Sequence, residues 1–472
     1  MRKLDFKDFK NHIKEAAEAF SKIDKKETLR IISHLDADGI SSCAILTKAL
    51  NNDNRKYTIS IVQQVDKNIL EGLSKESYDY FVFTDLGSGQ LKEISKTLKS
   101  KNVFIIDHHQ PETEEKIKSI VHVNPHLFGI DGSKEISSSG IVYLFTSHLN
   151  KKNEELAHIA FLGVIGDIQE RELSELNREI LDVAIKKGSI AVKRGLRVFG
   201  AQTRPLHKVL EYSTDPYIPD VTGSETNAIQ FLQQIGINPK GERGWKKLVD
   251  LDEEEMNKLV TGIVMKRLNE ARPEDVLGEI YLFPKEEEGP TRDAKEFSTL
   301  LNACGRLNRA SLGIGACLGD KKAKAKAIQN LNNYKKEIIN ALNWFHRSSD
   351  SNDIIKEEGF VIINARDNIL STIVGTLASI ISKSNELPEG TFILSLAQMD
   401  TNKTKVSLRI SGKNDRDRDL RAIIKKITDE VGGEAGGHVD AAGAIIPIEK
   451  EEAFIDVAKK ILKREHIEER VV

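Results

Sequence analysis

The hydrophobic positions between residues 27 and 125 form short runs that alternate with segments of helical spacing. Strands that alternate with helices predict a parallel sheet with right-handed crossover connections. The helical spacing is clearest in SSCAILTKAL and LKEISKTLK. The runs that we interpret as buried strands are TLRIIS (28–33), TISIV (58–62), YFVFT (80–84), VFII (103–106) and IVHV (120–123).

The pattern changes several times beyond residue 140, which predicts more than one domain. Residues 140–195 have mostly helical spacing, and 200–300 contain few apolar runs before helical spacing returns, with Asp252 as an expected N-cap. A long helical pattern without Gly or Pro covers 321–346, and a strand–helix–strand–strand pattern covers 359–448.

The fold class that we predict is α/β. A parallel-sheet catalytic domain with an inserted, mostly helical subdomain is joined by a long helix to a smaller C-terminal α/β domain. The expected boundaries are 1–199 for the catalytic domain, 200–300 for the inserted subdomain, 301–350 for the helical completion and connecting helix, and 351–472 for the C-terminal domain.

Composition limits the classes of protein to which the chain can belong. None of the 472 residues lie in an apolar run of about 18, so no transmembrane helix or membrane partner is expected. The three cysteines, at positions 43, 304 and 317, have no metal-site spacing, which fits a reducing, cytoplasmic location. A net charge of −2 argues against broad phosphate neutralisation but leaves room for local basic surfaces.

Acidic and imidazole side chains follow three of the expected strands, at the point where each strand ends. In a parallel sheet these carboxyl ends share one edge, which is where ligands bind. If the segment from His34 to Asp38 stays extended, alternation projects its three polar residues in one direction, and Gly39 lets the backbone turn into the helix. The residues concerned are His34, Asp36 and Asp38, then Asp85, then Asp107, His108 and His109, with Asp167 after the later apolar run FLGVIG.

Five carboxylates in one crevice repel one another unless cations compensate their charge. Oxygen ligands with some imidazole suit two Mn²⁺ ions, or Mg²⁺, and the lack of thiolate argues against a structural zinc site. One aspartate that bridges two ions gives a centre that activates water and steadies phosphoryl displacement. Each acid alone is more often a turn or cap residue, so the prediction depends on their joint occurrence.

These residues together resemble the DHH phosphoesterase superfamily, and most of the chain resembles its archaeal RecJ-like exonucleases. The resemblance implies one metal held by His34, Asp36 and Asp85, and a second held by Asp38, Asp85, His108 and Asp167. It also implies that His109 reaches the scissile phosphate and that Asp107 orients its neighbours. The residues to which it assigns catalysis are Asp38, Asp107 and His109.

The segment GGEAGGHVDAAGA (432–444) is similar to the glycine-rich signature of the DHH-associated substrate-binding domain. Small residues allow a phosphate to approach the backbone closely, and backbone N–H groups can face it. A glycine-rich run is otherwise more often a flexible loop. The substrate-binding residues that the resemblance implies are Arg409, Ser411, Gly436, Gly437 and His438.

The function that we expect is hydrolysis of single-stranded nucleic acid to mononucleotides in DNA replication or repair. The resemblance alone implies cleavage from the 5′ end of DNA, and neither this polarity nor the choice of DNA over RNA follows from the residues. One alternative is a phosphoesterase for dinucleotides, cyclic dinucleotides or polyphosphate. Another is a non-catalytic replication scaffold, and the inserted subdomain is a reasonable docking surface for the GINS complex.

Overall fold

The computed structural model describes residues 6–242, 244–270, 272–384, 386–412, 414 and 418–467. The chain divides into two compact units, Met1–Leu331 and Asn332–Val472, which are described separately. The predicted α/β class is confirmed, because parallel strands alternate with helices in the first unit and a second α/β fold follows.

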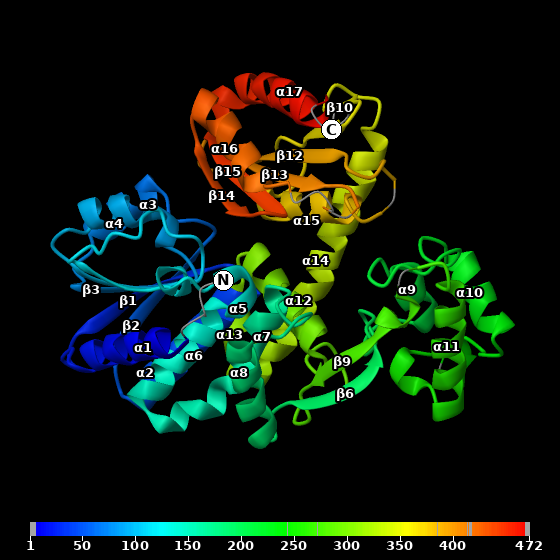
Figure 1. Ribbon diagram of the computed structural model, residues 1–472, viewed down its shortest axis with the longest axis horizontal. Helices are drawn as coiled ribbons and strands as arrows, with labels where there is room; N and C mark the ends of the chain where they lie inside the picture. The colour runs from blue at the N-terminus through cyan, green and yellow to red at the C-terminus, as the bar shows by residue number, and fades with distance from the viewer. Residues whose placement is uncertain are drawn as a thin grey trace. The chain divides into compact units, whose positions relative to one another are not determined.

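The larger unit is built on a five-stranded parallel sheet in the order β2-β1-β3-β4-β5 (Figure 1). All five strands expected from the sequence are present, with bounds that shift by two residues at most. They are β1 (Thr28–His34), β2 (Lys56–Val62), β3 (Tyr80–Thr84), β4 (Asn102–Ile106) and β5 (Ile120–Val123).

Successive side chains on each strand point to opposite faces of this sheet, and each face has its own apolar core. One face packs on two short helices through a cluster that includes Ile32, Phe83 and Ile105. Phe104, one residue before Ile105, instead packs edge-on against Phe20 on the other face. The helices of the first face are α3 (Lys67–Ser74) and α4 (Leu91–Thr97), and those of the second include α1 (Phe6–Ser21), α2 (Ala37–Asn52) and α6 (Ser138–Leu149) (Figure 1).

Helix α7 (Ala157–Gly166) is buried along almost its whole length, as its largely apolar sequence predicts. It contacts α2 and α6 as well as two later helices, and it therefore joins the sheet domain to the helices that follow. The remaining helices of this part are α5 (Gly132–Glu135), α8 (Glu175–Lys186), α12 (Ala294–Arg306) and α13 (Ala310–Cys317), with 3₁₀ turns η1 (Ser88–Gln90), η2 (Pro125–Phe128) and η3 (Lys151–Leu156).

The region between α8 and α12 is the insertion. It begins and ends in an antiparallel pair, β6 (Ala191–Leu196) and β9 (Leu277–Leu282), so the last residues of the segment expected to be mostly helical are a strand. The partner strand lies some 80 residues away along the chain, so no local pattern in the sequence signals this pairing. Asp252 caps α11 by accepting a hydrogen bond from the Glu255 N–H at 2.8 Å, as predicted. The other elements are α9 (Leu206–Glu211), α10 (Glu225–Gln234), α11 (Glu253–Lys266) and the hairpin β7 (Lys240–Gly241) and β8 (Gly244–Trp245).

The long helix expected at 321–346 is confirmed as α14 (Lys321–Arg347). The division between the two units falls within it, at Leu331. This single helix therefore carries the chain from one unit into the next.

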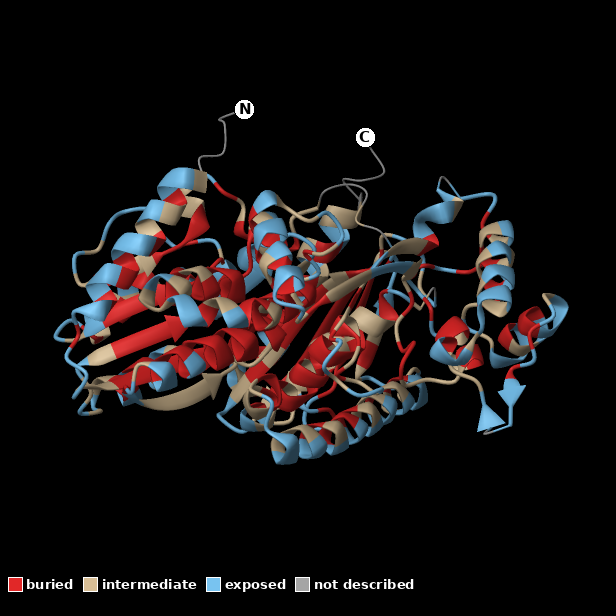
Figure 2. Cartoon of the chain, turned by 90° about the horizontal axis from the view of Figure 1, so that it is seen from below, coloured by how far each residue is buried: buried red, intermediate tan, exposed pale blue. Residues whose placement is uncertain are grey.

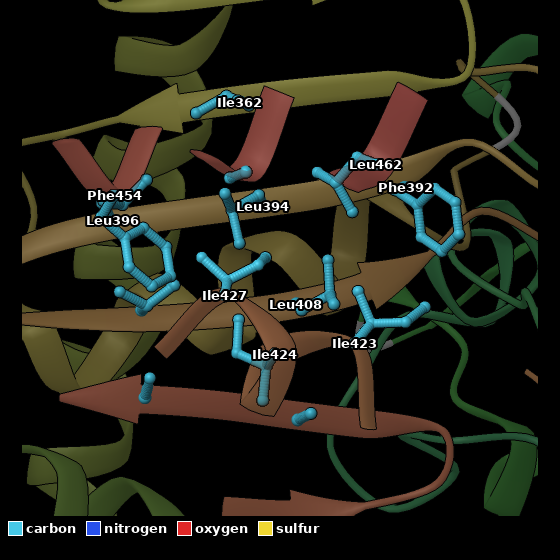
Figure 3. Close-up of a cluster of buried hydrophobic side chains, with 14 of the residues drawn as sticks. Ile362, Phe392, Leu394, Leu396, Leu408, Ile423, Ile424, Ile427, Phe454 and Leu462 are labelled. Carbon is cyan, nitrogen blue, oxygen red and sulfur yellow. The ribbon is translucent and has the colours of Figure 1, made fainter. Parts of the chain in front are cut away.

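The smaller unit has a six-stranded sheet in the order β10-β11-β12-β13-β15-β14, in which only β11 and β12 are parallel. Its core lies between one face of the sheet and two helices, where Leu394, Leu408 and Phe454 meet Ile424 (Figure 3). The strands are β10 (Ile354–Glu357), β11 (Phe360–Asn364), β12 (Phe392–Met399), β13 (Lys403–Ile410), β14 (Glu434–His438) and β15 (Ala441–Pro447), and the helices are α15 (Ser371–Ile381), α16 (Leu420–Val431) and α17 (Glu451–Ile467).

Burial follows the amphipathic pattern in both units: strands are largely buried, whereas the outer faces of the helices are exposed (Figure 2). Within the described residues, no helix combines the length and the apolar character that crossing a bilayer requires.

Candidate metal centre

The acidic and imidazole residues singled out in the first 167 positions meet at the carboxyl edge of the parallel sheet. His34 is the last residue of β1, and Asp85 and Asp107 directly follow β3 and β4. Asp167 is the C-cap of α7 rather than the end of a strand. The burial of the group is graded, because the Asp38, Asp85, Asp107 and His108 side chains are buried whereas His34, Asp36, His109 and Asp167 are partly exposed.

The segment from His34 to Asp38 does not stay extended, so that expectation was wrong. Asp36 is the N-cap of α2 and accepts a hydrogen bond from the Gly39 N–H at 3.0 Å, and the helix starts at Ala37. Asp38 therefore lies in the first helical turn. Gly39 is needed for a close approach, because a Cβ atom there would lie 2.4 Å from the carbonyl oxygen of His34.

Asp38 is held by the start of a second helix. Its Oδ2 accepts from the Ser138 N–H at 2.7 Å, and its Oδ1 accepts from the Ser139 N–H at 3.0 Å. Both donors belong to the first turn of α6, where N–H groups have no partner within the helix. The N-terminal end of α6 thus orients this carboxylate.

Asp85 lies between two groups of potential ligands. Its Oδ2 is 3.3 Å from Nδ1 of His34, which is itself 3.0 Å from Oδ2 of Asp36. On the other side, Oδ1 of Asp85 is 3.6 Å from Nε2 of His108, and that nitrogen is 3.4 Å from Oδ2 of Asp167. One carboxylate therefore faces both groups, one oxygen to each. Three sets of ligand atoms lie close enough to share an ion: His34, Asp36 and Asp85; Asp38, His108 and Asp167; and Asp85, His108 and His109.

Two buried oxygens in this cluster fit bound cations. Oδ1 of Asp85 and Oδ2 of Asp167 have no hydrogen-bond partner among the described residues. Burial and the neighbouring carboxylates, Asp36 first among them, raise the pKa of Asp85 well above its ordinary range, and burial and Asp38 do the same for Asp167. A bound cation would lower the free-energy cost of ionising these two buried carboxyl groups. A set of carboxylates and imidazoles without thiolate suits Mn²⁺ or Mg²⁺.

Asp36 differs from these two carboxylates. Burial alone would raise the pKa of Asp36, but the adjacent imidazole of His34 outweighs this effect and holds the pKa below its ordinary range. Of these three carboxylates, Asp36 is stabilised by an imidazole, whereas Asp85 and Asp167 need a further cation.

The orientation of His108 is set from behind by Gly132. Because the Gly132 carbonyl can only accept, Nδ1 of His108 donates to it at 2.9 Å, which leaves the Nε2 lone pair directed at Asp85 and Asp167. The Gln169 amide donates to the same carbonyl at 3.0 Å. A Cβ atom at position 132 would lie 2.0 Å from the His108 carbonyl oxygen, so this support requires glycine. Fixing the second ring nitrogen is how metal-ligating histidines are commonly oriented.

His109 has a different partner from His108. Its Nδ1 donates to Oδ1 of Asp107 at 2.7 Å, so the lone pair of that nitrogen is not available to a metal. Burial would raise the pKa of Asp107, but His109, His108 and the hydrogen bond from the Ser88 N–H together hold it below its ordinary range. Asp107 belongs to none of the three ligand sets and serves to orient the imidazole of His109.

Sequence reasoning missed two residues that brace this pair. Asn124, directly after β5, is fully buried, and its amide nitrogen donates both to the His109 carbonyl at 2.8 Å and to Oγ of Ser88 at 2.9 Å. Ser88 Oγ in turn lies within hydrogen-bond distance of Nε2 of His122, at 2.9 Å, and burial lowers the pKa of that imidazole to about 4. The only available signal was position, since Asn124 ends a fourth strand at the same edge.

The predicted substrate-binding residues lie on one region of the smaller unit. Arg409 is on β13, and its Nε donates to the Ser379 hydroxyl at 3.0 Å. Ser411 is buried and its hydroxyl donates to the Leu387 carbonyl, so it is engaged by the main chain rather than presented at the surface. The glycine-rich run forms a hairpin of β14 and β15, in which Gly436 faces open space and Gly437 has a φ of 121°. The side chain of His438 lies outside the described residues.

Comparison with known families agrees with this geometry. Residues 28–164 match the DHH family N-terminal domain, residues 198–280 the DHH-CID domain and residues 358–464 the DHHA1 domain. The chain belongs to the DHH family. The resemblance drawn from the motif residues is therefore confirmed, and the protein is a DHH-family hydrolase.

Some similar proteins match this chain over almost their full length, and others over part of it. An uncharacterized protein of Methanocaldococcus jannaschii is 31% identical over 443 residues, which cover 92% of this chain and 93% of the relative. Among solved structures, CDC45 from Entamoeba histolytica has a TM-score of 0.64 at 14% identity and covers 96% of this chain and 99% of its own. RecJ in complex with Mn²⁺ from Thermus thermophilus has a TM-score of 0.58 at 16% identity and covers 96% of this chain. This DHH-family chain spans only 55% of that RecJ chain.

Proposed function

We propose that this DHH-family hydrolase is a metal-dependent exonuclease that degrades single-stranded nucleic acid to mononucleotides. The observation that carries the proposal is Asp85, whose two oxygens each face a separate group of potential ligands. A carboxylate in this position suits two Mn²⁺ ions, with Mg²⁺ as the alternative. A further solved structure of similar fold, at 16% identity and a TM-score of 0.56, is an exonuclease RecJ bound to manganese.

The chemistry that we assign to the site is hydrolysis of a phosphodiester. Bound divalent cations would lower the pKa of a water molecule and stabilise negative charge on the phosphate oxygens. His34, Asp36 and Asp85 would hold one ion, and Asp38, Asp85, His108 and Asp167 the other. His109, oriented by Asp107, would contact the scissile phosphate. A new phosphorus–oxygen bond would form to the water oxygen, the bond from phosphorus to the leaving oxygen would break, and the leaving oxygen would take up a proton in exchange for the one that the water releases.

We assign the grip on the rest of the substrate to the smaller unit, through Arg409, Gly436, Gly437 and His438. A glycine-lined hairpin next to an arginine suits a phosphate group. Ser411 remains a prediction whose hydroxyl would first have to leave the Leu387 carbonyl.

A cleavage assay on labelled strands would test this function. Single strands of DNA and of RNA, tens of nucleotides long and labelled at either end, would be incubated with Mn²⁺ and with a chelator. We expect Mn²⁺-dependent release of mononucleotides from the 5′ end of DNA, and none from Asp38→Ala or Asp107→Ala. Cleavage that survives both substitutions would refute the site. Cleavage of dinucleotides without cleavage of strands would establish a small-substrate phosphoesterase instead.

We also propose that the insertion docks a replication partner, with the GINS complex as the candidate. Support comes from an apolar groove of 680 Å³ between α10 and α11, lined by Phe231, Ile235 and the 60% exposed Met265. The fold that this chain shares with CDC45 is consistent with such a role. Purified GINS should bind the wild-type chain, and Met265→Glu should weaken binding at least about tenfold while nuclease activity persists.

A further inference from the structure

Six α-helices in the described part of the larger unit end in the same way. In each, the residue after the C-cap has a positive φ, and its N–H donates to the carbonyl of the residue three positions earlier. The N–H of the following residue donates to the carbonyl of the residue five positions before itself. This is the paired capping pattern that normally places glycine, or sometimes asparagine, at the positive-φ position. The six residues are Asn54, Ile168, Gly188, Gly236, Asn308 and Gly319, at the ends of α2, α7, α8, α10, α12 and α13.

Ile168 is the exception among these six. It has a φ of 59°, and its β-branched side chain is poorly suited to that conformation, which glycine and asparagine adopt far more easily. Burial does not explain the isoleucine either, because the residue is 56% exposed. Neither the backbone nor the apolar core of the unit therefore accounts for this side chain.

The position of Ile168 relative to the candidate metal centre is its second distinctive feature. It directly follows Asp167, which shares a set of potential ligands with Asp38 and His108. The Asp167 and His109 side chains are 19% and 32% exposed, so this part of the centre opens to solvent. The strained, exposed isoleucine is thus one residue away from the opening. Backbone strain that persists without a structural gain is typical of functional sites.

We propose that Ile168 is a substrate-contacting residue that packs against the sugar or base of the nucleotide whose phosphate is hydrolysed. This inference rests on the proposed function and deepens it. An aliphatic side chain gains free energy when it covers apolar surface, and it gains none against phosphate oxygens. A nucleoside offers such surface and inorganic polyphosphate does not. The substrate class is accordingly a phosphate ester of a nucleoside.

The test compares stability with substrate affinity in Ile168→Gly. Glycine fits the left-handed conformation, so the metal-free variant should unfold about 2 °C above the wild type. Loss of the apolar contact should raise KM for an oligothymidylate about fivefold to tenfold with little change in kcat. Ile168→Val, which keeps a branched apolar side chain, should retain a KM close to that of the wild type.

Asn54→Gly is the matched control, because it places glycine in the same conformation at the far end of α2. It should leave KM unchanged. A lower unfolding temperature or an unchanged KM in Ile168→Gly would overturn the inference.

Two further substrates separate this inference from the exonuclease proposal. If the wild type hydrolyses a dinucleotide but no strand, the exonuclease proposal fails, and the same KM comparison on the dinucleotide decides the role of Ile168. If it hydrolyses tripolyphosphate alone, both fail.

Discussion

At the scale of single residues, the two neighbouring histidines have different hydrogen-bond partners, and we therefore expect them to have different tasks. His108 donates to the Gly132 carbonyl and directs its other nitrogen into the ligand cluster, whereas His109 donates to Asp107. The two residues are adjacent in sequence, and their rings pack edge-on with centroids 4.5 Å apart. We expect the group behind each ring, Gly132 for His108 and Asp107 for His109, to decide its role.

His108→Ala and His109→Ala should accordingly have separable effects. We expect His108→Ala to lower Mn²⁺ affinity by at least about tenfold, because it removes a ligand. His109→Ala should preserve Mn²⁺ affinity and lower kcat by about 10²–10⁴-fold, because it removes a group that contacts the phosphate. Titration calorimetry with Mn²⁺ and single-turnover cleavage would measure the two quantities. Equal losses of metal affinity in both variants would contradict the assignment.

At the scale of elements, the ends of four strands and the ends of four helices supply the candidate centre and its support. β5 is an edge strand of the sheet, yet the asparagine that follows it anchors the loop after β4. The amide of Asn124 uses both of its N–H groups on that loop and on Ser88, and its oxygen accepts from the His126 N–H at 2.9 Å. The asparagine is thus fully bonded and has one orientation.

Asn124→Ala should lower kcat about tenfold to a hundredfold, because small displacements of a catalytic group are costly. Mn²⁺ affinity should not change, since Asn124 touches no potential ligand other than through the His109 backbone. Asn153→Ala is the control, because Asn153 is also fully buried and bonded on both sides, to Thr146 and Asn52, within a different part of the fold. Both variants should lose about 1–3 kcal/mol of stability. A similar loss of kcat in Asn153→Ala would show a general effect of destabilisation.

At the scale of the whole molecule, bound cations would connect segments that lie far apart in the chain. The candidate ligands span residues 34 to 167 and come from three strands and two helices. In the absence of cations, the folded protein holds Asp85 and Asp167 at raised pKa values. When folding raises the pKa of a carboxyl group, the folded protein loses stability as the pH rises from the pKa of that group in the unfolded chain toward its pKa in the folded protein.

Stabilisation by Mn²⁺ should therefore grow with pH. At low pH the cation must displace protons from Asp85 and Asp167, whereas at high pH it relieves repulsion between carboxylates. With free Mn²⁺ about a hundredfold above its Kd, we expect the unfolding temperature to rise by about 5 °C at about pH 8, and by clearly less at about pH 5.5. Thermal unfolding with Mn²⁺ and with chelator would measure this difference. Asp85→Asn should abolish the dependence, and equal shifts at both pH values would refute it.

Much of the fold was predictable because its signals are local. Five runs of apolar residues predicted five strands, and the helical pattern without Gly or Pro at 321–346 predicted α14. The strand at 191–196 was missed because its partner, β9, lies far along the chain. The extended conformation expected for His34 to Asp38 failed because the capping side chain of Asp36 starts a helix between them.

Although Asp38 and Asp167 reach the centre from helices, most of the residues that carry the proposed chemistry follow from the sequence alone, because the carboxyl ends of parallel strands must meet at one edge. Their division of labour does not. The proton on Nδ1 of His108 and the anchoring amide of Asn124 both depend on groups that the folded chain brings together from distant positions. Hydrogen bonds between positions far apart in the chain leave no periodic pattern in the sequence. Only the tertiary structure therefore indicates which side chain is available to a cation, which orients another side chain and which is exposed to a substrate.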